Sequence, residues 1–136
     1  MDTNVLLFFE EHQGALPLYE KLEEAIQREI DNVTVKVQKT QITFYKKRLF
    51  ACVSFARVRK AAQLPDPYMV VTFGLEHREE SPRIDIATEP YPNRWTHHVV
   101  IHEKEEIDEE LMGWIKEAAV FAETKKRKKA REQIRK

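Results

Sequence analysis

The sequence predicts one α+β domain with a mainly antiparallel sheet of about five strands, on one face of which the helices from the two ends of the chain pack. Apolar residues recur every three or four positions near both ends of the chain, whereas in the middle they alternate with a period of two. The length of 136 residues suits a single domain with its own core. No apolar run approaches the roughly 20 residues that span a bilayer.

The N-terminal part is predicted to form two helices. Thr3 can cap a short helix over residues 4–12. After Gly14, a longer amphipathic helix is expected to end near residues 31–32. Its apolar positions lie three and four residues apart, at Leu18, Tyr19, Leu22, Ala25, Ile26 and Ile30. Such a helix has one apolar stripe and must bury it against another element.

The middle of the chain is predicted to form the sheet. Apolar and polar residues alternate from Val33 to Val37 and again from Ile42 to Tyr45, and a polar turn follows at Lys46-Lys47-Arg48. We expect strands over residues 33–37, 42–45, 49–58, 68–75 and 95–101. Residues 79–91 contain Pro82 and Pro90, which predict an irregular segment.

The last predicted helix has a clear start. Asp108 suits the cap position, and Ile107 before it can contact Met112. The apolar stripe ends near Ala122, so we predict a domain over residues 1–123 and a basic tail over residues 124–136, which either extends the helix or frays. The predicted core consists of Leu22, Ile26, Val35, Phe44, Val53, Val71, Phe73, Val99, Leu111, Trp114, Ile115 and Ala118.

The net charge of zero hides a segregation of charges along the chain. Residues 32–65 contain eight basic and no acidic side chains, and residues 125–136 carry a net charge of +7. Unless acidic residues from elsewhere neutralise them, these segments predict weak, salt-sensitive binding of nucleic acid through its phosphates. The candidate nucleic-acid-binding residues are Lys36, Lys46, Lys47, Arg48, Lys125, Lys126, Arg127, Lys128 and Lys129.

Motifs of known enzyme classes are weak in this sequence. The three glycines are too far apart for a phosphate-binding loop, and neither Ser54 nor Ser81 lies in a nucleophile elbow. Cys52 is the only cysteine and lies in an apolar strand, which favours a buried, inert thiol. His98 and His102 are roughly 13 Å apart along a strand, too far to share a metal. The sequence therefore predicts no catalytic residue, metal or cofactor, and leaves enzymatic activity open but disfavoured.

Residues 89–101 combine two prolines with an arginine, a tryptophan and a pair of histidines. Strand alternation predicts that His97 points inward beside Trp95 and that His98 points outward.

Four short strings carry a resemblance to a known family: Lys39-Thr40-Gln41-Ile42, Phe50-Ala51, Ser81-Pro82-Arg83-Ile84 and Arg94-Trp95-Thr96-His97-His98. Over residues 4–122 the chain resembles a family of small bacterial and archaeal domains, domain of unknown function 5655. It is more distantly similar to MmcQ/YjbR-like domains, which are α+β and for which a double-wing DNA-binding role has been suggested. Neither resemblance supplies catalytic or binding residues.

The resemblance to the first family implies only a cluster of positions: Lys39, Gln41, Arg83, Arg94, Trp95, His97 and His98. One interpretation is that they build an anion or phosphate pocket, because cations, an aromatic ring and amide donors suit such a ligand. The other is that the two arginines pair with Asp85, Glu89 or nearby backbone carbonyls and only hold the loop in place.

Three functions follow from these observations. We expect a non-enzymatic binding domain that engages a phosphate-bearing ligand such as nucleic acid through the basic strands and tail. The alternative is a small-molecule or anion-binding domain, or an enzyme, that uses the Arg/Trp/His pocket. A third is a scaffold whose charges only solvate it. Residues 1–4 lack the basic region of a secretory signal, so we predict a cytoplasmic protein without a membrane partner.

Overall fold

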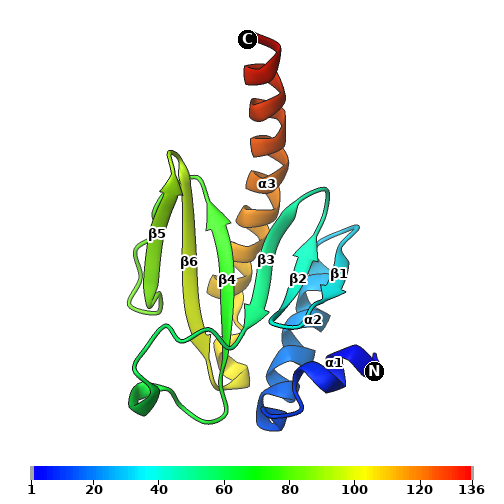
Figure 1. Ribbon diagram of the computed structural model, residues 1–136, viewed down its shortest axis with the longest axis vertical. Helices are drawn as coiled ribbons and strands as arrows, with labels where there is room; N and C mark the ends of the chain where they lie inside the picture. The colour runs from blue at the N-terminus through cyan, green and yellow to red at the C-terminus, as the bar shows by residue number, and fades with distance from the viewer. Residues whose placement is uncertain (1, 136) are drawn as a thin grey trace.

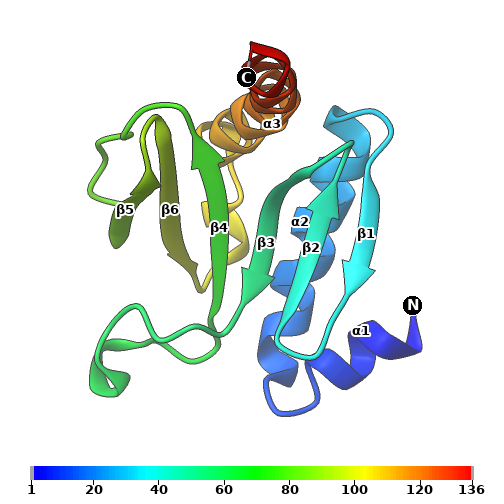
Figure 2. The same ribbon diagram turned by 45° about the horizontal axis from the view of Figure 1, so that its top comes forward.

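The computed structural model describes residues 2–135, with side chains for residues 2–124. In this part of the chain the strands form one six-stranded sheet in the order β1-β2-β3-β4-β6-β5, and every neighbouring pair is antiparallel. Two helices, α2 and α3, lie behind the sheet on the same side (Figures 1 and 2). The helix α3 continues beyond the sheet and carries the C-terminus away from it (Figure 1).

The longest connections within the sheet are residues 55–68, between β3 and β4, and residues 76–85, between β4 and β5. The strands are β1 (Thr34–Val37), β2 (Gln41–Tyr45), β3 (Leu49–Ser54), β4 (Met69–Leu75), β5 (Ile86–Tyr91) and β6 (Arg94–Ile101). The α-helices are α1 (Thr3–Phe8), α2 (Leu16–Glu29) and α3 (Glu109–Arg135), and single 3-10 turns occur at Gln13–Ala15, Ala61–Gln63 and Lys104–Glu106. No helix in the described residues is both long enough and apolar enough to cross a membrane.

The α+β class and the antiparallel sheet are confirmed, but the expected irregular segment contains a strand. β5 is an edge strand that pairs only with β6, and an edge is where a strand tolerates a proline. The ladder is irregular between Thr88 and Tyr91, which accommodates the proline. Asn93 closes the hairpin with a φ of 63°, a conformation that asparagine tolerates.

The predicted third strand was too long. β3 ends at Ser54 instead of residue 58 because Phe55 leaves the sheet. Its ring stacks on His12 at 3.9 Å and on Phe8 at 5.3 Å between ring centroids. These contacts with the N-terminal segment draw the chain away from β2.

The helix starts are set by aspartates. Asp108 accepts a hydrogen bond from the backbone N–H of Leu111 at 3.0 Å, as predicted for the cap of the last helix. At the other end of the chain the cap is Asp2, whose carboxylate accepts from the N–H of Asn4 at 2.7 Å, so the expectation of a Thr3 cap was wrong. α1 also stops at Phe8 rather than at residue 12.

The core lies between the sheet and the two long helices. Phe73 of β4 is stacked between two rings, with His97 of β6 at 5.0 Å on one side and Trp114 of α3 at 5.6 Å on the other. The predicted core residues are buried, apart from Val35. Val35 is half-buried because β1 is an edge strand with no neighbour on its outer side.

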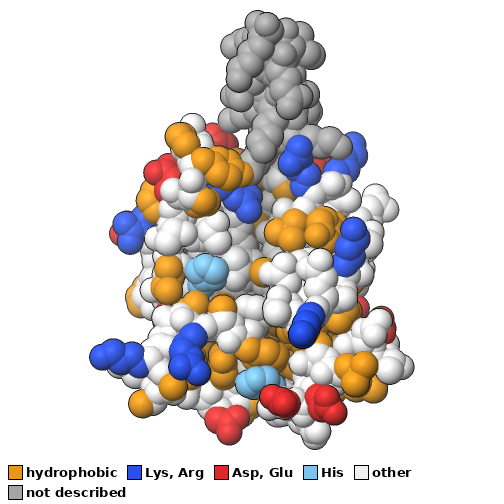
Figure 3. Space-filling model, in the orientation of Figure 1, with side chains coloured by type: hydrophobic (Ala, Val, Ile, Leu, Met, Phe, Trp, Pro, Cys, Tyr) orange, Lys and Arg blue, Asp and Glu red, His pale blue; other side chains and the backbone are white. Residues whose placement is uncertain are grey.

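The second face of the sheet carries no helix (Figures 1 and 2). Because successive side chains point to opposite faces, Thr72 and Gly74 point away from the helices that Phe73 contacts. Thr72 is paired with His98 of β6, whose side chain therefore lies on this open face. Figure 3 shows this face, with a histidine among neutral side chains at its centre.

Candidate functional site

The turn between β2 and β3 carries three consecutive basic residues, as predicted. The ammonium of Lys46 lies 3.4 Å from the carboxylate of Glu123 on α3. Lys47 is exposed, and the buried Nε atom of Arg48 has no hydrogen-bond partner among the described residues. The Lys46–Glu123 contact thus places the basic turn beside α3, two residues before the basic tail begins.

Arg94, the first residue of β6, supplies a fourth cation near the same place. Its guanidinium lies over Gly74, so close that a Cβ atom on residue 74 would overlap it. It also lies 5.9 Å from the centre of the Phe121 ring of α3. Among residues with described side chains, no carboxylate lies within ion-pair distance of it.

Burial lowers the pKa of Arg94 from its ordinary value. The guanidinium nevertheless stays charged at neutral pH, because an arginine titrates far above it. A cation that is partly desolvated and lacks an anionic partner is a favourable site for a phosphate.

Phe121 and Glu123 lie two residues apart on α3, so Arg94 and the basic turn flank the same part of this helix. We call Lys46, Lys47, Arg48 and Arg94 the cationic end. Figure 3 shows basic side chains gathered around the point where α3 leaves the sheet. The contacts of Lys46 and Arg94 with α3 bring together residues that are far apart in the sequence.

Two further groups on the sheet add donors to the site. His98 shares a hydrogen bond of 2.8 Å with the hydroxyl of Thr72, and burial lowers the pKa of its ring. Lys36 is exposed and lies 4.8 Å from the centre of the Tyr45 ring. The predicted tail contacts of Lys125, Lys126, Arg127, Lys128 and Lys129 lie outside the described side chains.

Arg83 is neutralised, which matches the second sequence interpretation, although its carboxylate partners are not the two that were considered. The guanidinium bonds to Asp108 and Glu110, both at 2.9 Å, and to the backbone carbonyl of Glu106 at 2.6 Å. It also covers the Trp114 ring at 5.8 Å. Arg83 therefore ties the segment before β5 to the start of α3.

The other residues of the predicted anion pocket lie in different places. Lys39 and Gln41 lie at the turn between β1 and β2, where they line a hollow of about 490 Å³ with Phe8 and Phe55. Trp95 lies under Arg78, 5.8 Å from its guanidinium. His97 points into the core and His98 to the open face, as predicted. The structure does not bring the seven side chains into one pocket.

His97 is a hydrogen-bonded histidine of the core, in keeping with its predicted inward orientation. The ring is fully buried, and its Nε2 atom accepts a hydrogen bond of 2.9 Å from the backbone N–H of Glu79. An acceptor at Nε2 requires a neutral ring with its proton on Nδ1. Desolvation by burial lowers the pKa of His97, which favours this neutral form.

We expect the protein to lose stability as the pH falls below about 6.5, the ordinary value for histidine. In the folded state the pKa values of His97 and His98 are lowered by burial, so the unfolded chain binds more protons in this range. The free energy of unfolding should therefore be greatest above pH 6.5 and fall as the pH drops toward the folded pKa values. Urea unfolding at pH 7.5, 6.0 and 5.0 measures this.

A substitution distinguishes the contribution of His97 to this pH dependence from that of the carboxylates. His97→Gln should flatten the pH dependence between 6.5 and 5, whereas His102→Gln, which removes an exposed histidine, should keep it. Equal slopes in the two variants would contradict the role of His97.

Gly74→Ala is expected to displace Arg94 without changing any charge. The new methyl group overlaps the guanidinium, which is the flexible end of a side chain and can swing into solvent. The fold should therefore persist. If Arg94 binds phosphate, the affinity for nucleic acid should fall by several-fold, as it should for Arg94→Gln. An unchanged affinity in both variants would remove Arg94 from the site.

One group in the described residues has the donors for a metal ion: His77, Glu79 and Glu117. Sequence reasoning missed it because it considered only His98 and His102. His77 and Glu79 follow β4, whereas Glu117 comes from α3, about 40 residues later. No sequence spacing signals such a group, since only the packing of α3 against β4 assembles it.

A family model described as Domain of unknown function (DUF5655) matches residues 7–121, which is most of the chain. The chain belongs to this family. The predicted resemblance is thereby confirmed, whereas the more distant similarity to MmcQ/YjbR-like domains stays a prediction. Comparison with curated proteins and with solved structures gave no match. The DUF5655 match covers the sheet and most of the part of α3 that packs on it, and it ends before the basic tail.

Proposed function

We propose that this DUF5655 protein binds nucleic acid through phosphate contacts at its cationic end and along the tail. The main support is the contact of Lys46 with Glu123. It places the basic turn next to the residue from which α3 continues into residues 125–136, a segment with a net charge of +7. The basic turn thus lies beside the residue that precedes this charged segment in the chain.

The spacing of the donors favours a polymer over a small anion. Arg94 and His98 lie on the same face of β6, four residues apart, which is roughly 13 Å along a strand. The donors extend further, to Lys36 on the edge strand β1, and a set spread over several strands suits the successive phosphates of a nucleic-acid chain better than one small anion. Thr96 lies between them on this face of β6 and is neutral, and Figure 3 shows mostly neutral side chains over the open face.

Binding of this kind is expected to be weak and indifferent to base sequence. Phosphate contacts supply affinity and position, but they carry no sequence information. Glu123 reduces the charge of the basic turn in part, which lowers the expected affinity further. We propose a cytoplasmic binding domain without catalysis and without a membrane partner.

The alternative, a small-anion or enzymatic pocket of Arg, Trp and His side chains, has less support. Arg83 is neutralised by two carboxylates, and His97 is buried on the other face of the sheet from His98. Of the two arginines in this pocket, only Arg94 keeps a free charge among the described residues. A single arginine gives a weak anion site unless other donors converge on the same ligand.

The test is fluorescence anisotropy of the full chain with mixed-sequence duplex DNA and single-stranded RNA at about 50–300 mM salt, concentrations chosen to resolve counterion release. The variant Lys46→Gln/Lys47→Gln/Arg48→Gln should weaken binding and reduce the salt slope by about 0.9 for each phosphate that the protein no longer neutralises. The matched control removes three charges from the helices, as Lys21→Gln/Arg28→Gln/Lys116→Gln. These residues line the groove between α2 and α3.

The control changes the net charge equally, so it should have a much smaller effect than the turn variant. Equal decreases in affinity in the two triple variants would mean that only overall charge matters, and the assignment to the cationic end would be wrong. No detectable binding by the intact chain at the lowest salt concentration would reject the nucleic-acid function itself.

A further inference from the structure

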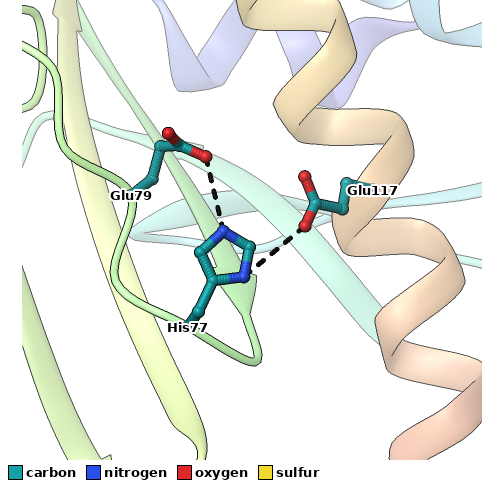
Figure 4. Close-up of side chains that lie close together, drawn as sticks. All are labelled: His77, Glu79 and Glu117. Carbon is teal, nitrogen blue, oxygen red and sulfur yellow. Dashed lines mark hydrogen bonds and ion pairs between the residues drawn. The ribbon is translucent and has the colours of Figure 1, made fainter.

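We propose that His77, Glu79 and Glu117 bind a divalent transition-metal ion, with Zn²⁺ as the best fit. Figure 4 shows the three side chains turned toward one another across the space between the end of β4 and α3. One ligand atom from each lies within 4.8 Å of the other two. The site shares no residue with the cationic end and does not depend on the proposed function.

The distances are close to those of a coordination sphere. The ring of His77 lies between the two carboxylates. Its Nε2 atom is 3.4 Å from the carboxylate of Glu79, and its Nδ1 atom is 3.7 Å from the carboxylate of Glu117. With metal–ligand bonds of about 2.0–2.2 Å, ligands of a tetrahedral zinc lie roughly 3.4 Å apart. Because one metal uses a single ring nitrogen and the ligand atoms are up to 4.8 Å apart, one carboxylate must move closer to that nitrogen, which rotation of a glutamate side chain allows.

The ring of His77 also lies between two anions. A neutral imidazole has one N–H, so it can donate to only one of the carboxylates at its two nitrogens. The lone pair of the other nitrogen then faces a carboxylate oxygen, which is unfavourable. A cation resolves this repulsion, and a divalent metal does so more strongly than a proton because it balances both carboxylates.

The scaffold around the ligands is rigid. The backbone of Glu79 is held by its hydrogen bond to His97, a residue that is fully buried and stacked on Phe73. Glu117 lies on α3 beside the buried Ala118, so its helix is fixed against the sheet. The side chains themselves remain accessible, with 54% of His77 and 49% of Glu117 exposed. Accessible ligands on a fixed frame suit metal entry and binding.

The donor set decides the class of metal. One imidazole nitrogen and two carboxylate oxygens suit Zn²⁺ and related transition metals. Mg²⁺ and Ca²⁺ prefer all-oxygen sites, and Cu⁺ prefers sulfur ligands. With three protein ligands, water would complete a tetrahedral zinc site.

The test is isothermal titration of the untagged full chain with Zn²⁺ alone. We expect one Zn²⁺ per chain and no comparable binding of Mg²⁺. His77→Gln and Glu117→Gln should each weaken Zn²⁺ binding at least about tenfold. Loss of a residue that only hydrogen-bonds a metal ligand already lowers metal affinity by about 10-fold or more, and these two residues are ligands themselves. The matched control is His102→Gln, since His102 and Glu106 form an exposed pair 3.9 Å apart and no second carboxylate pairs with His102 among the described side chains. This control should bind Zn²⁺ like the unaltered chain.

Two results would overturn the proposal. One is the absence of stoichiometric binding by the unaltered chain, and the other is equal affinity in the His77 variant and the His102 control. Circular dichroism of each variant shows whether it is folded. We expect both variants to fold, because the side chains of His77 and Glu117 are exposed. As a second measurement, Co²⁺ in the unaltered chain should give the intense visible absorption of a tetrahedral site, which Glu117→Gln should abolish.

Discussion

Deleting residues 125–136 is expected to weaken nucleic-acid binding by about a thousandfold at about 50 mM salt. The segment contains eight basic residues and one acidic residue. Each neutralised phosphate contributes about 0.9 to the slope of log affinity against log salt. Loss of three such phosphate contacts therefore lowers the affinity by roughly three powers of ten at this salt concentration. Anisotropy with the same mixed-sequence DNA, at several salt concentrations, measures both the affinity and the slope.

The folded domain should retain part of the binding after this deletion. The residual binding is assigned to the cationic end, so adding Lys46→Gln/Lys47→Gln/Arg48→Gln to the truncated chain should remove it. If truncation alone abolishes all binding, the tail is the whole site and the folded domain has another role. A truncated chain that binds as tightly as the full one would exclude the tail instead.

Replacing Trp114 by alanine is expected to lower the free energy of unfolding by about 3–5 kcal/mol, the usual cost of truncating a buried tryptophan. Only 7% of this residue is exposed. Its ring stacks on Phe73 at 5.6 Å and is covered on another side by Arg83 at 5.8 Å. The substitution therefore removes the packing of α3 on the centre of the sheet and opens a cavity there.

Urea unfolding monitored by circular dichroism measures this change, with Val120→Ala as the matched control. Val120 lies on the same helix but is 67% exposed, so its truncation should change stability by less than about 0.5 kcal/mol. A decrease below about 1 kcal/mol for Trp114→Ala would show that α3 is not held by this packing.

Much of the fold was predictable because it depends on local patterns. The period of three to four around Leu22 and the period of two around Val35 follow from helix and strand geometry, and the cap at Asp108 is a short-range hydrogen bond. β5 was missed because Pro90 opposes strand formation locally. A proline is tolerated in β5 because this strand lies at the sheet edge, and that position depends on the whole fold and not on the sequence of the segment.

The candidate site was predictable only in part. The basic turn at residues 46–48 and the basic tail are visible as runs of charge, and the opposite orientations of His97 and His98 follow from strand alternation. The pairing of Arg83 with Asp108 and the position of Arg94 over Gly74 were not predictable. These contacts join residues that are far apart in the chain, and an isolated sequence contains no signal for the carboxylate, or the glycine, that a given arginine meets.

The sequence by itself determined the class of the fold, the main helices and strands, the family and the separation of charge along the chain. The tertiary structure decided which charges remain free, since Arg83 meets two carboxylates and Arg94 meets none among the described residues. It also brought His77 and Glu79, which follow β4, close to Glu117 of α3. The physical reason is the range of the forces: hydrogen-bond and steric preferences act within a few residues and are written in local sequence. Charge pairing acts through space, between groups that only the packed helices and sheet bring together.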